Sequence, residues 1–78
     1  MPTVFEILGY RFFFYSNESN EPIHVHVEKG DAEAKIWMNP ILEQYAYGFK
    51  SRERKEIIKL AKENSDKIIK SWNEHFKK

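Results

Sequence analysis

The stretch EPIHVHVEKGDAEAKIWMNP, residues 21–40, reads as two β-strands joined by a two-residue turn. Gly30 supplies the positive φ that the first central position of a type II′ turn requires, with Asp31 as the second central residue. On one side of this hairpin, apolar residues then face apolar residues in three pairs: Val27 and Ala34, Val25 and Ile36, Ile23 and Met38. The sequence therefore predicts a hairpin with one apolar face.

The opposite face of the hairpin carries its polar and titratable side chains, again in three facing pairs: Glu28 and Glu33, His26 and Lys35, His24 and Trp37. A register shifted by one residue would place Val25 against Lys35 and mix the two faces, which the two-residue period of a strand penalises at every position. Two of the three histidines in the chain are therefore expected to project from the same side of the sheet.

The segments on either side of the hairpin also have strand character. YRFFFYS, residues 10–16, is aromatic and ends in a cluster of turn-forming residues at 16–22. Its alternation is apolar on both faces, as in a central strand that contacts protein on both sides. Pro40 ends the second arm of the hairpin, and ILEQYAYGF, residues 41–49, is interpreted as a short edge strand.

Residues 51–77 are predicted to be helical. One apolar stripe with a period near 3.6 runs the whole length of this segment: Ile57, Leu60, Ala61, Asn64, Ile68, Trp72 and Phe76. Ser51 is the expected N-cap, with Glu53 in the first turn, where the helix dipole favours an acid. Asn64 lies within ENSD, where one helix could end and another begin. The pattern leaves open whether the segment is one helix, a kinked helix or two helices.

These elements predict an α+β fold for a single domain over residues 1–78, β-rich over 1–49 and helical over 50–78. We expect a small antiparallel sheet of three to four strands, packed against a long or kinked C-terminal helix or two helices. A chain of 78 residues is near the lower size limit for one apolar core.

Composition limits the function classes. The absence of cysteine excludes disulfides and thiol chemistry and is typical of a reducing compartment. No basic leader and no apolar run of membrane-spanning length is present, so we expect a cytoplasmic protein with no membrane partner. The formal net charge is +1, with most Lys and Arg in residues 50–78.

The polar face of the hairpin has the residue types for acid–base chemistry on RNA. A histidine can take or give a proton during attack by a 2′-hydroxyl, which makes His24 and His26 candidate catalytic residues. Lys35, facing His26, could stabilise the developing negative charge. Arg11 and Tyr15 on a neighbouring strand would add phosphate contacts. This hypothesis requires that the imidazoles and the ammonium group be accessible on the surface.

Two other interpretations use the same side chains. His24, His26 and Glu28 have the ligand types of a two-histidine, one-carboxylate metal site, although no further motif with metal-ligand spacing supports it and no cofactor is predicted. Alternatively, these residues form structural cross-strand pairs, with Trp37 covering His24. The sequence leaves the three interpretations open.

Several motifs resemble the small prokaryotic family called domain of unknown function 4160, over essentially the whole chain. They are the opening MPT, the strand and turn RFFFYSNE, the segment PIHVH, the arm EAKIW and the closing WNEHF. The positions that match the motifs of the family are Arg11, Asn17, Glu18, His24, His26, Glu33, Lys35, Trp37, Trp72, Asn73 and Phe76.

The resemblance implies a cytoplasmic component of a toxin–antitoxin pair that binds a cognate small protein of the domain of unknown function 2442 type. Of the matching positions, Arg11, Asn17, Glu18, Glu33 and Trp37, together with Tyr15, are the candidate binding residues. The family identifies none of its positions as catalytic. An RNA-directed activity, a purely non-enzymatic protein- or nucleic-acid-binding role, and a homodimer formed through an exposed edge strand all remain open.

Overall fold

The computed structural model describes residues 3–15 and 20–76. Its centre is the predicted hairpin, formed by β3 (His24–Lys29) and β4 (Ala32–Met38). The register is confirmed, with Val25 opposite Ile36 and His26 opposite Lys35. Of the two central turn residues only Gly30 has a positive φ, 60°, as a type II′ turn requires. The alternation of the sequence therefore determines which side chains share a face.

The sheet has five strands, so the expectation of three to four was wrong. The additional strand is β1 (Thr3–Ile7), which pairs antiparallel with β2 (Tyr10–Phe13). Leu8 and Gly9 join them with φ values of 56° and 85°. Such a turn, with both central residues at positive φ, normally uses Asn or Gly, so a leucine there gave no turn signal in the sequence.

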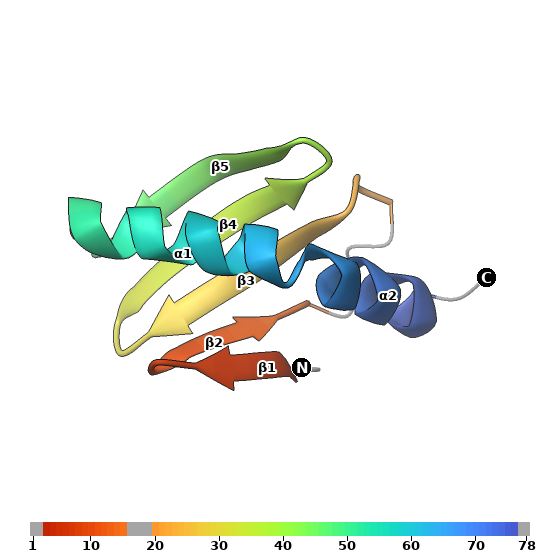
Figure 1. Cartoon of the computed structure of the whole chain (residues 1–78), viewed down its shortest axis with the longest axis horizontal. Coiled ribbons are helices and arrows are strands. Elements are labelled where there is room, and N and C mark those ends of the chain that lie inside the picture. Colours follow the sequence, from red (N-terminus) through yellow and green to blue (C-terminus); the bar gives the residue numbers. More distant parts are fainter. Residues whose placement is uncertain (1–2, 16–19, 77–78) are drawn as a thin grey trace.

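The strands are arranged in sequence order, β1-β2-β3-β4-β5, so β1 and β5 are the edges (Figure 1). β5 (Ile41–Tyr47) confirms the edge strand expected after Pro40. The register shifts between Thr3 and Phe5 at one edge and between Lys35 and Ile36 at the other. Each edge pairing is therefore interrupted by a bulge, a feature that discourages uncontrolled edge-to-edge pairing.

The helical segment forms two helices, α1 (Ser51–Glu63) and α2 (Ser65–His75), which is one of the arrangements left open by the sequence. The break is at Asn64, whose φ of −115° and ψ of 20° depart from helical values, and whose side-chain amide donates to the Leu60 carbonyl oxygen at 2.9 Å. Ser51 is not the N-cap. The cap is Lys50, whose backbone N–H donates to the Glu53 carboxylate at 2.9 Å.

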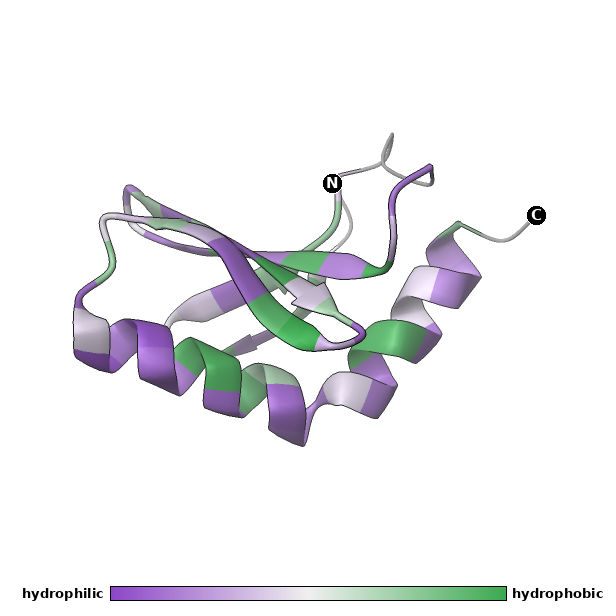
Figure 2. Ribbon diagram, turned by 90° about the horizontal axis from the view of Figure 1, so that it is seen from above, coloured by the Kyte–Doolittle hydropathy of each residue, from purple (hydrophilic) through white to green (hydrophobic). Residues whose placement is uncertain are grey.

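Both helices lie on one side of the sheet, with α1 against β4 and β5 and α2 against β1 (Figure 2). The predicted stripe faces inward, because Ile57, Ala61 and Ile68 are at most 1% exposed. It packs against the apolar face of the sheet to form the main core. The principal strand residues in that core are Phe5, Tyr10, Phe12, Val25, Val27, Ala34, Ile36 and Met38, and Phe14 joins them from just beyond β2. The opposite face of the sheet, here called the open face, carries the candidate functional residues.

Candidate functional site on the open face

The open face brings the predicted catalytic residues together. His24 and His26 are alternate residues of β3, so both project from this side of the sheet, and their ring centroids are 5.2 Å apart. Lys35 on β4 is directly opposite His26. The predicted placement of these three side chains on one face is therefore confirmed.

The surface accessibility that the acid–base hypothesis requires is not observed. His24 is 0% exposed, His26 3% and Lys35 7%. The His26 ring stacks on Phe13, with centroids 5.5 Å apart, and meets the edge of Tyr15 at 4.5 Å. Phe13 and Tyr15 follow the core-facing Phe12 and Phe14 in alternation, which confirms that this strand contacts protein on both faces. The histidines are thus part of a second, smaller packed layer.

Glu33 is the polar centre of this layer. Its carboxylate accepts a hydrogen bond from the Tyr45 hydroxyl at 3.0 Å and a long one from the Tyr15 hydroxyl at 3.5 Å. His26 Nδ1 is 3.6 Å from the same carboxylate. A carboxylate beside one ring nitrogen fixes the orientation of an imidazole, as in many catalytic sites. Here the imidazole itself is buried, so the geometry also suits a structural contact.

His24 connects the sheet to the second helix. Its Nδ1–H donates to the Pro22 carbonyl oxygen at 2.8 Å, which assigns the proton to Nδ1 because a carbonyl oxygen can only accept. Its ring lies 5.4 Å from Trp37 on β4 and 5.0 Å from Trp72 on α2, centroid to centroid. Trp37 does cover His24, as the structural interpretation proposed. His24 therefore helps to hold α2 against the end of the sheet.

Lys35 is already neutralised within the chain. Its ammonium donates to the Glu21 carboxylate at 2.7 Å and lies 4.6 Å from the centroid of the Trp37 ring. An ammonium group held by a carboxylate and an indole gives less stabilisation to a phosphorane than a free one would. Glu21 was expected only to form a turn, and nothing in the local pattern indicates that it reaches Lys35.

Arg11 is also engaged by the chain. Its guanidinium donates to Glu28 at 2.7 Å and to the Thr3 hydroxyl at 2.9 Å, and it lies over the Phe13 ring at 4.5 Å. Glu28, the third residue of the predicted metal trio, is thereby an ion-pair partner. No group of three or more His, Cys, Asp or Glu side chains could hold a metal ion within residues 3–15 and 20–76.

The charge of the open face is slightly acidic. Its described charged side chains are four carboxylates, Glu6, Glu21, Glu28 and Glu33, and two cations, Arg11 and Lys35. Nucleic-acid sites normally carry a surplus of positive charge that replaces the counterions of the phosphates. The electrostatics of this face therefore favour a structural role or a protein contact over RNA binding.

The other residues that the sequence predicted for binding do not form one site. Tyr15 packs against His26, Trp37 is half-buried, and Asn17 and Glu18 lie outside the described residues. Tyr45 lies in the predicted edge strand and was not recognised from the sequence as a contact of this face. The bulge in β5 aligns it with Lys35, within reach of Glu33. No helix in the described part of the chain is long and apolar enough to span a bilayer.

A comparison with family models matches residues 9–73 of the 78-residue chain to the family described as Domain of unknown function (DUF4160). The chain belongs to this family. The match covers β2 to β5 and both helices up to Asn73, which confirms the resemblance seen in the sequence motifs. The DUF4160 chain has no significant match among curated proteins or among solved structures.

Proposed function

We propose that this DUF4160 protein is the binding component of a cytoplasmic toxin–antitoxin pair and acts by contacting a cognate small protein. The family resemblance suggests a partner of the domain of unknown function 2442 type. The observation that carries the proposal is the burial of His24, His26 and Lys35 together with the pairing of the Lys35 ammonium. The side chains that could act in acid–base catalysis are instead used to stabilise the sheet. We therefore look for the function in contacts made by the surface of the molecule.

The exposed apolar side chains support a binding role. Leu42 is 59% exposed and Tyr47 68% exposed, and both lie on the edge strand β5. The Tyr47 ring is stacked on that of Tyr45 at a centroid distance of 5.1 Å. Large apolar and aromatic side chains at a sheet edge are typical of protein–protein contacts, where tyrosine often supplies much of the binding energy.

The test is co-expression of the chain with the product of its neighbouring gene, followed by purification through a tag on the partner alone. We expect the two proteins to elute together in gel filtration at the mass of a complex. Light scattering on the chain by itself would detect a homodimer formed through the same edge. Separate elution of two folded proteins at micromolar concentration would contradict the proposal.

An RNA-directed activity is the second candidate, favoured by the carboxylate of Glu33 beside Nδ1 of His26. In that case Glu33 would orient the imidazole, and opening of the overlying aromatic layer would admit RNA. His26→Gln and Glu33→Gln keep similar side-chain volumes, so folded variants can be compared with the wild type in an RNA cleavage assay. Activity that is equal in all three proteins would exclude His26 as the catalytic base.

A further inference from the structure

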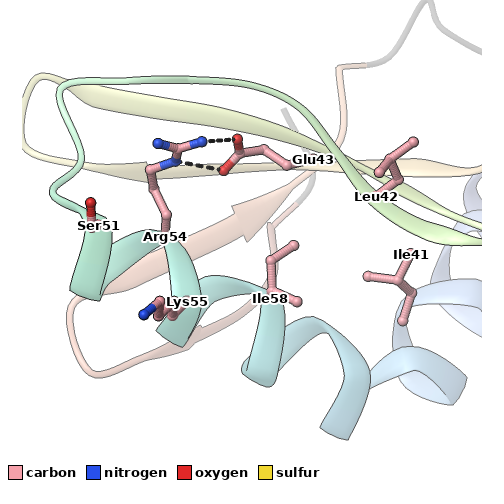
Figure 3. A pocket seen from close by; sticks show the side chains of 7 residues that line it. All are labelled: Ile41, Leu42, Glu43, Ser51, Arg54, Lys55 and Ile58. Carbon is pink, nitrogen blue, oxygen red and sulfur yellow. Dashed lines mark hydrogen bonds and ion pairs between the residues drawn. The ribbon is translucent and has the colours of Figure 1, made fainter.

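A groove of about 560 Å³ separates the edge strand β5 from α1. Ile41 of β5 and Ile58 of α1 point into it from opposite sides (Figure 3). Both are partly buried apolar residues that pack against the main core. The floor of the groove is therefore a continuation of the core that remains open on its outer side.

An ion pair crosses one end of the groove. Arg54 of α1 donates to the two carboxylate oxygens of Glu43 of β5 at 2.6 and 3.0 Å (Figure 3). Because both groups are engaged, neither contributes surplus charge to the groove. The pair also ties the helix to the strand, so that the two walls are held at a fixed separation.

The outer wall of the groove is basic. Lys55 lines the groove, and Lys62 lies four residues after Ile58, so both neighbour Ile58 on the surface of α1. Lys59 extends the row, and all three lysines are exposed. None of them has an ion-pair partner among residues 3–15 and 20–76. A row of three exposed lysines without a direct ion pair in this part of the chain thus borders an apolar floor.

The strand edge gives the groove a second contact surface. β5 pairs with β4 on its inner side, and successive residues point to opposite faces, with Leu42 directed away from Ile41 (Figure 3). The bulge between the Lys35–Tyr45 and Ile36–Glu43 pairs restricts a regular edge to Ile41–Glu43. A segment laid along this edge would cover Ile41 on the helix side and would pass next to Leu42 at the edge itself.

We propose that this groove is the docking site for an extended segment of the partner protein in which apolar and acidic side chains alternate. The apolar side chains contact Ile41 and Ile58, and the acidic ones face Lys55 and Lys62. The inference rests on the proposed function and identifies its surface and the chemistry of its partner. A nucleic-acid strand fits less well, because phosphates gain nothing from an isoleucine floor and Arg54 is already held by Glu43.

A synthetic peptide of alternating glutamate and valine is the first probe, titrated into the isotope-labelled full chain and followed by NMR. We expect shifts of the Ile41 and Ile58 methyl signals, and at least tenfold weaker binding to the Lys55→Glu/Lys62→Glu double variant. Lys70→Glu, a charge reversal at an exposed lysine on α2, is the control and should bind as the wild type does. Absence of shifts, equal binding of a lysine–valine peptide, or tighter binding of an RNA oligonucleotide would overturn the proposal.

The second measurement uses the co-purified partner and separates this inference from the proposed function. The double variant and Leu42→Asp should weaken that complex at least tenfold, whereas Leu8→Asn, at the other exposed leucine, should leave it unchanged. If the partner binds all variants equally, the docking site is wrong and the binding function stands. If no partner binds but the acidic peptide still binds at the groove, the site stands and the proposed pairing fails.

Discussion

The Lys35–Glu21 ion pair offers a direct test of whether the open face is structural. Its two members are buried to different extents, since the Lys35 side chain is 9% exposed and that of Glu21 is 37% exposed. Removing one member therefore has different consequences from removing the other. Glu21→Gln leaves an ammonium group buried without its carboxylate, whereas Lys35→Met leaves a carboxylate that water can solvate.

The expected magnitudes follow from this asymmetry. A buried charged group that loses its partner typically costs about 1–3 kcal/mol, so we expect Glu21→Gln to lower the free energy of unfolding by about 2 kcal/mol. Methionine retains the packing of the lysine stem on Trp37, so we expect Lys35→Met to cost less than about 1 kcal/mol. In the double variant no ammonium remains to be stranded, and its stability should equal that of Lys35→Met.

Urea unfolding followed by circular dichroism measures all four proteins of this double-mutant cycle. For a domain of this size 1 kcal/mol corresponds to roughly 4–8 °C, so Glu21→Gln should lower the melting temperature by about 10 °C. The reasoning is refuted if Glu21→Gln costs no more than Lys35→Met. That result would mean that water solvates the Lys35 ammonium group when Glu21 is absent. Lys35 would then again be a candidate catalytic residue.

Three further predictions concern single sites. Burial and the hydrogen bond to Glu56 raise the pKa of Tyr10 to about 12. Above pH 10 the Tyr10 hydroxyl therefore loses its proton more readily in the unfolded chain than in the folded one. We expect unfolding titrations to show a loss of about 3 kcal/mol between pH 10 and 12 that Tyr10→Phe abolishes. The hydrogen bond from Arg54 lowers the pKa of Glu43, so its contribution to stability is present above pH 4.5 and is lost as the pH falls further. Acid unfolding of Glu43→Gln should lack that step. Gly30→Ala places a side chain at a φ of 60°, which should cost about 1 kcal/mol in thermal melts, and Gly30→Asn should cost less.

The hairpin could be predicted because its determinants are local. Gly30 fixes the turn, and three facing apolar pairs penalise every shifted register, so residues 21–40 contain the information needed to align them. The inward face of the helical segment was predictable for a similar reason, since its stripe repeats from Ile57 to Trp72. In both cases the period of the pattern identifies the face, and the structure confirms it.

The errors arose where a turn gives no signal of its own in the sequence or where a distant segment decides the outcome. Leu8 adopts a left-handed conformation because β1 and β2 pair around it, and a leucine gives no sign of that turn. The burial of the His26 side chain was not predictable either. The alternation of the strand predicts which face of the sheet His26 is on, but it does not predict which residues cover that face. The cover comes from Phe13 of β2 and from Tyr15, which lies just beyond that strand. Tyr45 of β5, beyond a bulge, adds a hydrogen bond to Glu33 next to the His26 ring.

The two edges of the sheet explain why a binding surface should be sought at β5. Both edges contain a bulge, so neither invites indiscriminate pairing. At the β1 edge, α2 packs against the strand, and Lys67 of that helix lies 5.3 Å from the Phe5 ring. At the β5 edge α1 also packs against the strand, but a groove remains open between Ile41 and Ile58, and Leu42 is exposed on the opposite face of the sheet. Exposed apolar surface lowers solubility unless a partner covers it, so its presence beside exposed lysines favours binding as the role of this edge.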